Sequence, residues 1–112
     1  MWIALDCNIY TNPKTIELAD VLGLDIDTTV AKLSRLWSWA MLAGNESGDI
    51  THLPPEEVAA IMRWKKKPEM LYCALVSHGF IDVTDNRKII HDWHELNGKQ
   101  IIKKRQDRER KG

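Results

Sequence analysis

Hydrophobic residues recur at helical spacing along most of this 112-residue chain. The clearest stripe has five members that are three or four residues apart: Val30, Leu33, Trp37, Ala40 and Met41. Residues at this spacing lie on one face of a helix, so the stripe predicts a long helix over residues 28–43. Asp27 is placed to cap the first turn of this helix, and Gly44 is placed to end it.

A shorter helix is predicted ahead of the long one. In Asn12-Pro13, the asparagine can cap free backbone amides, and the proline loses no useful donor at the first helical position. Three apolar residues continue the helical pattern: Ile16, Ala19 and Leu22. Gly23 then predicts the end of this helix. The apolar run at residues 2–6 predicts an extended lead-in or a first strand.

Residues 51–93 form the region around which the rest of the chain is organised. Two prolines followed by two glutamates, at residues 54–57, open a helix, because early proline and first-turn acids both suit a helix N-terminus. Three consecutive lysines follow this helix: Lys65, Lys66 and Lys67. Pro68 begins a second helix, and Gly79 ends it. The three lysines therefore occupy a short turn between two helices.

The pattern changes after the second helix. Apolar residues alternate over residues 80–83 and 88–90, around a polar Asp85-Asn86 tip, which indicates a β-hairpin. Residues 49–51 can add a brief third strand to it. A helix, a turn, a helix and a hairpin in this order are typical of the winged helix-turn-helix fold. We therefore predict a mainly α fold with a small β-hairpin wing.

Two parts of unequal charge make up the chain. Residues 1–98 carry nine Lys/Arg against fourteen Asp/Glu, whereas residues 99–112 carry seven against two. We expect the first part to be a winged-helix domain with an extra N-terminal helix. We expect the second part to be a basic helical tail, with Gly98 interrupting the helix ahead of it. An acidic body with a basic tail is typical of contact with nucleic acid or with an acidic partner.

Composition narrows the class of protein further. The run of apolar residues needed to span a membrane is missing, and a hydrophobic leader is missing too, so we expect a cytoplasmic protein without membrane contact. Cys7 and Cys73 are far apart in the sequence and are expected to be reduced thiols. Five tryptophans are present against one phenylalanine. Such large aromatic residues usually anchor a core, which is the role expected for Trp37, Trp39 and Trp64.

The chain resembles the N-terminal winged-helix domain of phage and prophage replisome-organiser proteins, which are related to DnaD-like primosomal proteins. The resemblance rests on the order and spacing of short motifs over nearly the whole chain. These motifs are Asn12-Pro13-Lys14 with Leu18-Ala19, Leu33 with Leu36-Trp37-Ser38-Trp39-Ala40, Gly48-Asp49-Ile50, Ala74-Leu75 with Gly79-Phe80-Ile81-Asp82, His91-Asp92-Trp93, and the charged run from Lys104 to Arg110. The resemblance implies replication initiation, with DNA binding, self-association into a homo-oligomer and recruitment of helicase-loading or other replication proteins.

Candidate nucleic-acid contacts fall into three groups. The lysines of the turn (Lys65, Lys66 and Lys67) can reach phosphates while the second helix docks, although the same lysines could simply be solvated. Arg87 and Lys88 lie beside the hairpin tip, where surface charge also serves solubility. The tail supplies the strongest electrostatic signal, with a solvated linker helix as the competing interpretation. Its predicted contacts are Lys103, Lys104, Arg105, Arg108 and Arg110.

The outward face of the second helix suits a protein partner at least as well as DNA. The residues expected on it are Glu69, Met70, Tyr72, Cys73, Val76 and Ser77. This set lacks Arg, Asn and Gln, the side chains that pair best with base edges. An alternative hypothesis is therefore an oligomerisation module without DNA contact, with Trp2, Tyr72 and Val76 in the interface. A transcriptional repressor is a further alternative, and it requires sequence-specific DNA contact.

The sequence favours no catalytic, metal or cofactor site. His91 and His94 are three residues apart, but further ligands at metal-binding spacing are missing. Glu56 and Glu57 open a helix without a neighbouring nucleophile. The chain also lacks a glycine-rich phosphate loop and a dinucleotide fingerprint. We therefore expect a binding module that is not an enzyme.

Overall fold

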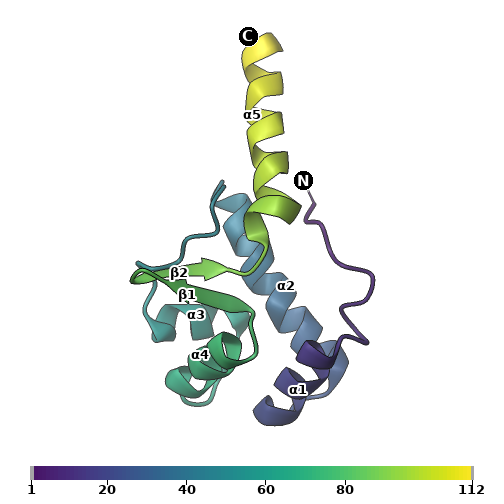
Figure 1. Ribbon diagram of the computed structural model, residues 1–112, viewed down its shortest axis with the longest axis vertical. Coiled ribbons are helices and arrows are strands. Elements are labelled where there is room, and N and C mark those ends of the chain that lie inside the picture. Colours follow the sequence, from purple (N-terminus) through teal and green to yellow (C-terminus); the bar gives the residue numbers. More distant parts are fainter. Residues whose placement is uncertain (1, 112) are drawn as a thin grey trace.

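The structure is a computed structural model that describes residues 2–111, and the side chains of residues 2–108. The described chain is mainly helical with one antiparallel hairpin, which confirms the predicted fold class. The elements, in order, are α1 (Pro13–Leu22), α2 (Ile26–Leu42), α3 (Pro55–Met62), α4 (Pro68–Ser77), β1 (Ile81–Thr84), β2 (Arg87–Ile90), the π-helical turn η1 (His94–Gly98) and α5 (Lys99–Lys111). Figure 1 shows α1 at one end of the molecule and α5 projecting from the other.

Local capping decides where α1 and α2 begin. The side chain of Asn12 accepts a hydrogen bond from Lys14 N at 2.9 Å, and Gly23 closes α1 with a φ of 68°, both as predicted. The predicted cap of α2 is wrong. Asp25 caps this helix by accepting a hydrogen bond from Thr28 N at 2.6 Å, and Asp27 lies in the first turn. Asp25 performs the role because its side chain reaches the amide three residues later.

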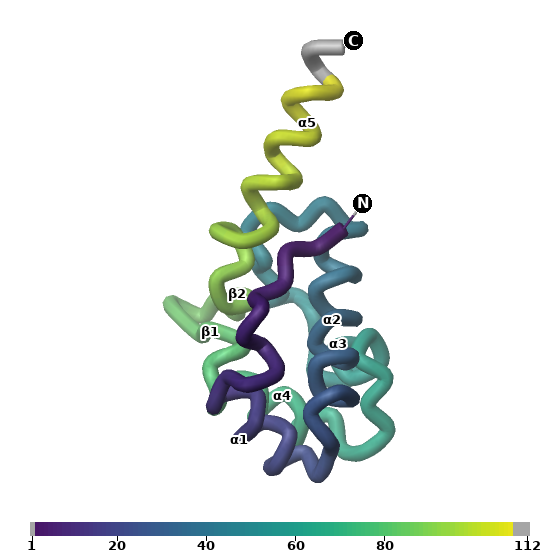
Figure 2. The backbone as a smooth tube through the Cα atoms, turned by 90° about the vertical axis from the view of Figure 1, so that its right-hand side faces the viewer, coloured from purple at the N-terminus to yellow at the C-terminus, as the bar shows by residue number. Residues whose placement is uncertain are grey.

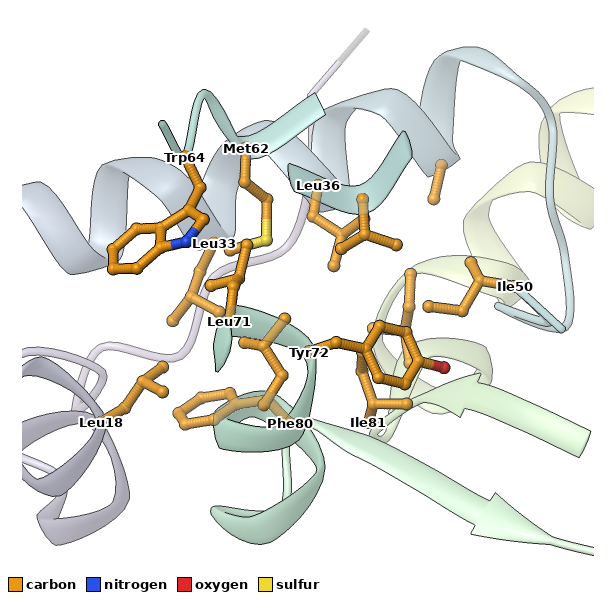
Figure 3. Close-up of a cluster of buried hydrophobic side chains, with 14 of the residues drawn as sticks. Leu18, Leu33, Leu36, Ile50, Met62, Trp64, Leu71, Tyr72, Phe80 and Ile81 are labelled. Atoms are coloured by element: carbon orange, nitrogen blue, oxygen red, sulfur yellow. The ribbon is translucent and has the colours of Figure 1, made fainter. Parts of the chain in front are cut away.

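The long helix α2 runs through the middle of the core. Leu33, Leu36 and Ala40 are at most 1% exposed. Trp37 and Trp39 are only partly buried, and they pack against the edge of the same cluster. The core joins side chains of α1, α3, α4 and the hairpin, as Figure 3 shows. Burial of this continuous apolar surface is the main force that holds the helices together.

The two helices on either side of the three lysines form as the sequence predicts. α3 and α4 both start with a proline in the first turn, and they pack against each other and against other helices of the core. α3 ends at Arg63, whose φ of 58° turns the chain sharply. Trp64 is 7% exposed, and its indole Nε1 donates a hydrogen bond to Lys67 O at 3.0 Å. This buried ring therefore anchors the turn that carries the lysines.

The wing is a two-stranded hairpin. Ile81 pairs with Ile90, and both side chains are 1% exposed, so the base of the hairpin is part of the core. Asp85 and Asn86 both have positive φ, the conformation that a tight two-residue hairpin turn requires. The expected third strand is present as a single bridge between Asp49 and Ile89.

The C-terminal helix continues from the wing through η1. Trp93 is 2% exposed, and its indole donates a hydrogen bond to Asn45 O at 2.6 Å. Gly98 was expected to interrupt the helix, but the helix continues through it. It marks the change from π-helical to α-helical hydrogen bonding, and it is buried so close to Glu46 that a Cβ there would overlap the Glu46 carbonyl. The molecule measures 48 × 30 × 24 Å along its principal axes.

The N-terminal segment is extended and forms no strand within residues 2–6. It runs alongside the body toward the base of α5, as Figure 2 shows. Ala4 N donates a hydrogen bond at 2.7 Å to Oδ1 of Asn97, which is 2% exposed. The described helices do not combine the length and the apolarity needed to cross a membrane.

Candidate nucleic-acid interface

A group of six cations surrounds the turn between α3 and α4, and we call it the basic turn cluster. Its members are Lys32, Arg35, Arg63, Lys65, Lys66 and Lys67. Lys32 connects the two parts of this cluster, because its Nζ donates to Arg63 O at 2.8 Å and to Met62 O at 3.3 Å. These carbonyls end α3, where the helix dipole attracts a cation.

The pKa of Lys32 reflects how close the cations of this cluster are to one another. Partial burial lowers the pKa of Lys32 from its ordinary value, and the positive charges of Arg35 and Lys65 lower it further. None of the six cations forms an ion pair with a carboxylate in the described part of the chain. The cluster therefore presents a concentration of positive charge at the turn of the helix pair.

Sequence reasoning found only the three lysines of the turn. Lys32 and Arg35 lie three residues apart on the polar side of α2, a spacing that is visible in the sequence. What the sequence does not contain is the packing of α2 against α3, which brings that side of α2 next to the turn. Arg63 joins them because it caps α3.

The outward face of α4 is narrower than predicted. Glu69, Met70, Cys73 and Ser77 are exposed. Tyr72 was expected on this face, but it is 8% exposed and belongs to the core. Val76 is likewise half-buried against the core, so its expected outward position is also wrong. The reason is that α1, α3 and β1 all pack on α4 and cover most of its circumference.

The two predicted cations of the wing are engaged by the body of the protein. Arg87 Nε lies 3.3 Å from Asp49 Oδ2. Lys88 Nζ lies 4.9 Å from the centroid of the Tyr72 ring, within the range of a cation–π interaction. The hairpin tip itself carries Asp85. The wing is thus poorer in free positive charge than the sequence suggested.

Some cations of α5 are engaged by neighbouring side chains, and others have no carboxylate partner among the described residues. Arg105 forms an ion pair with Glu46, and Lys104 Nζ lies 5.5 Å from the centroid of the Trp2 ring. Lys103 and Arg108 have no carboxylate partner in the described part of the chain. The side chain of Arg110, which was also predicted to contact nucleic acid, lies outside the described residues. Trp2, the third predicted interface residue, is 74% exposed.

The basic turn cluster and α5 do not form one continuous surface. Figures 1 and 2 both place α5 at the end of the molecule opposite α1, whereas the turn between α3 and α4 lies in the other half. The structure therefore separates two positively charged regions that follow one another only along the sequence. A nucleic acid touching both must extend over much of the molecule.

The two histidines near the end of the wing both contact neighbouring protein groups. His91 Nδ1 lies 2.8 Å from Asp82 Oδ2, and its Nε2 lies 3.3 Å from Asp92 Oδ2. His94 Nδ1 lies 3.3 Å from the Glu46 carbonyl oxygen. The described residues include no group of three side chains arranged to hold a metal ion. These histidines instead tie the end of the wing to its neighbours.

A hollow of about 190 Å³ lies beside His91, between the N-terminal segment and the wing. Three aromatic side chains line it: Trp37, Phe80 and Trp93. Its lysine is engaged, because Lys14 Nζ donates to Gly79 O at 2.9 Å and lies 5.0 Å from the Phe80 ring centroid. The residues that line the hollow include no Ser, Thr or Cys that could act as a nucleophile.

Comparisons of the chain with protein-family models, with curated proteins and with solved structures give no match. The similarity to replisome-organiser proteins therefore rests on the motifs named above and remains a prediction. Three surfaces of the molecule are candidates for a functional contact. These are the basic turn cluster, the basic helix α5 and the exposed apolar side chains near its base.

Proposed function

We propose that this protein is a replication-initiation module of phage or prophage type, which binds DNA without sequence preference and self-associates to help assemble a replisome. The observation that carries the DNA-binding part is the basic turn cluster. Six cations gather at the turn of a helix-turn-helix unit, and no described carboxylate pairs with them. Such a group binds phosphates favourably because it releases the counterions condensed on DNA.

The chemistry of α4 supports phosphate contact over base recognition. Its exposed side chains are Glu69, Met70, Cys73 and Ser77, which include none of the residues that form two hydrogen bonds with a base edge. A glutamate at the start of this helix also disfavours close approach to phosphates. In the proposed binding the lysines contact the phosphate backbone of the DNA and position the protein on it. The helix α4 contributes little discrimination between DNA sequences. This weakens the alternative of a transcriptional repressor.

The helix α5 supplies a second set of phosphate contacts. Lys103 and Arg108 are exposed, with no described carboxylate partner, on a helix that projects from the body. These contacts add affinity along the same nucleic acid if it spans the molecule. They are secondary in the proposal because Lys104 and Arg105 on the same helix already interact with Trp2 and Glu46.

A salt series tests the DNA-binding part. Binding of labelled duplex and single-stranded DNA is measured by fluorescence anisotropy at increasing salt, for the parent and for the triple variant Lys65→Gln/Lys66→Gln/Lys67→Gln. Each lost phosphate contact reduces the slope of log K against log salt by about 0.9 for duplex DNA. We expect the triple variant to bind more weakly at low salt, with a slope reduced by about two to three.

The matched control neutralises the two wing cations, Arg87→Gln/Lys88→Gln. Because both side chains are engaged by the body, we expect its slope to stay within about one of the parent value. Absence of binding by the parent at low salt would contradict the DNA-binding part. A footprint confined to one operator-like sequence would contradict the lack of sequence preference and support a repressor.

A second candidate function is a protein-interaction or oligomerisation module that does not contact DNA. The specific observation in its favour is the exposure of Leu42 and Trp2, at 78% and 74%. Contiguous apolar surface of this kind usually marks a contact with another protein. The salt series separates the two candidates, because self-association is common to both and only the first predicts binding to DNA.

A further inference from the structure

An apolar surface is uncovered where the end of α2 meets the N-terminal segment and the base of α5. One hollow, of about 200 Å³, is bordered by Trp2, Ile3 and Leu42. A second hollow, of about 240 Å³, is bordered by Leu42 and Ile101. Met41 and Leu42 line both hollows, so the surface is continuous across them. We call this surface the α2–α5 groove.

The rim of the groove is positively charged. Lys104, Arg105 and Arg108 line its second hollow, on the same face of α5 as Ile101. Arg105 is neutralised by its ion pair with Glu46. Lys104 and Arg108 have no carboxylate partner in the part of the chain that the structure describes. A ligand that fits this groove must therefore combine apolar side chains with negative charge.

The exposed face of α1 has that combination. Ile16 and Val21 are 45% and 48% exposed. The carboxylates Glu17 and Asp20 are exposed between them on the same side of the helix. Neither carboxylate forms an ion pair with a described residue. This helix therefore presents an uncovered face that is both apolar and acidic.

We propose that the exposed face of α1 docks into the α2–α5 groove of a second copy of this chain. In this contact the two apolar residues of α1 cover Leu42, and its two carboxylates face Lys104 and Arg108. The apolar contact supplies most of the association free energy. The opposite charges fix the orientation of the helix and exclude like-charged partners.

The position of the two surfaces determines the symmetry of the assembly. Figures 1 and 2 place α1 at one end of the long axis, and the carboxyl end of α2 with the base of α5 toward the other. In the proposed contact each interface uses one α1 face and one groove, so the contact is head-to-tail. Each added copy leaves one groove and one α1 face free. Such an assembly grows beyond a dimer and either closes into a ring or remains open.

A nucleic acid is the main competing occupant of the groove, because its rim is basic. The floor argues against it, since Leu42 and Ile101 are aliphatic side chains that offer nothing to a phosphate. An acidic and apolar helix matches both the floor and the rim. The inference rests on the self-association part of the proposed function and does not depend on the DNA-binding part.

Two variants of the full chain, each with one surface disrupted, test this arrangement. The first is Glu17→Lys/Asp20→Lys, which reverses the charge of the α1 face. The second is Leu42→Gln/Arg108→Glu, which disrupts the groove. Sedimentation velocity is run without DNA over a range of protein concentrations. We expect the parent to form species larger than a dimer, and each variant alone to associate at least about tenfold more weakly.

An equimolar mixture of the two variants gives the decisive result. The first variant retains an intact groove and the second retains an intact α1 face, so one productive contact is possible between them. We expect the mixture to form a one-to-one dimer and nothing larger. The matched controls, Glu56→Lys/Glu57→Lys and Val83→Gln/Lys99→Glu, make changes of the same kind at exposed positions outside both surfaces. We expect both controls to associate like the parent.

Three outcomes would overturn the inference. A parent that stays monomeric at every concentration removes self-association altogether, while DNA binding in the salt series stands or falls separately. A variant mixture that stays monomeric, with an associating parent, rejects the head-to-tail contact only. Association that requires added duplex DNA and is lost with Leu42→Gln/Arg108→Glu assigns the groove to nucleic acid.

Discussion

Gly48 occupies a position where a single methyl group would disturb the end of the wing. Its φ is +73°, and a Cβ placed there would lie 2.7 Å from Trp93 Cβ and 2.8 Å from two atoms of the indole ring. Trp93 is nearly fully buried and hydrogen-bonded, so it has little room to move. The close approach of Gly48 is therefore part of how the chain before α3 packs on the chain after β2.

We predict that Gly48→Ala lowers the free energy of unfolding by about 2–4 kcal/mol, which combines left-handed strain with overpacking. Gly23→Ala is the matched control. Gly23 has a φ of +68°, but no atom lies within 4 Å of the position that its methyl group would occupy, so only the strain of about 1 kcal/mol remains. Denaturant unfolding of both variants measures the difference, and equal losses would contradict the proposed clash with Trp93.

Asp49 forms the single bridge that joins the chain before α3 to the wing. Hydrogen bonds from the Thr51 hydroxyl, at 2.5 Å, and from Thr51 N, at 2.8 Å, lower the pKa of Asp49 below its usual value, and Arg87 lowers it further. Thr51 Oγ1 also accepts a hydrogen bond from Lys88 N at 2.8 Å. The ionised carboxylate thus orients a hydroxyl that binds the second strand.

A lowered pKa in the folded state gives a defined pH dependence. The contribution of Asp49 to stability is present above the ordinary carboxyl pKa of 3.8, and is lost as the pH falls through the lower value of the folded state. We predict that Asp49→Asn is less stable than the parent at neutral pH, and that this difference shrinks below about pH 4. Unfolding at several pH values measures it, with the exposed Asp107→Asn as control. A difference that is constant with pH would reject this account.

Among the helices, α5 changes character along its length. Ile101 is 8% exposed and packs into the core, and Ile102 is partly buried. Beyond them the side chains of residues 103–108 are polar, and those of residues 105–108 are exposed. A polar helix of this kind gains little from packing, so its far end is stabilised mainly by backbone hydrogen bonds.

We predict that amide hydrogen exchange in α5 is slow up to about Ile101 and fast from about residue 105 onward, because local opening costs little where no apolar surface is buried. Ile101→Asp should remove protection from the first turns of α5 while leaving α2 and α4 protected. Leu96→Asp, at a residue that is 46% exposed, is the control and should leave the pattern unchanged. Uniform protection along α5 in the parent would contradict this prediction.

The separation of the basic turn cluster from α5 has a consequence for the molecule as a whole. Sites that share no partners and lie far apart contribute to a free energy independently. We therefore predict that the losses of DNA affinity for Lys65→Gln/Lys66→Gln/Lys67→Gln and for Lys103→Gln/Arg108→Gln add, within about 0.5 kcal/mol, when the variants are combined. Anisotropy titrations at one fixed salt concentration measure all three.

Strong non-additivity would show that both regions contact the same short stretch of nucleic acid. Circular dichroism of each variant excludes unfolding as the cause, and the changed side chains are all exposed. A loss of DNA affinity in Lys65→Gln/Lys66→Gln/Lys67→Gln alone would assign DNA binding to the basic turn cluster and leave α5 to protein contacts.

Several features of the fold were predictable from the sequence because they depend on neighbours along the chain. Proline at the start of α1, α3 and α4 and the cap at Asn12 are local, and all four were predicted correctly. The tight turn of the hairpin follows from the polar pair at its tip. The cap of α2 was misplaced by two residues, from Asp25 to Asp27, because two nearby aspartates satisfy the same local rule.

Tertiary packing alone decided which sides of the helices face solvent. Tyr72 is buried, contrary to its predicted position, because three elements cover α4. Ile16 is exposed because one side of α1 is left uncovered. The basic turn cluster and the pair of Glu46 with Arg105 join residues distant in the chain. Helix capping and hydrophobic periodicity depend on residues a few positions apart, so both can be predicted from the sequence. Which faces meet depends on how the whole core packs, and it is this packing that creates the charged and apolar surfaces.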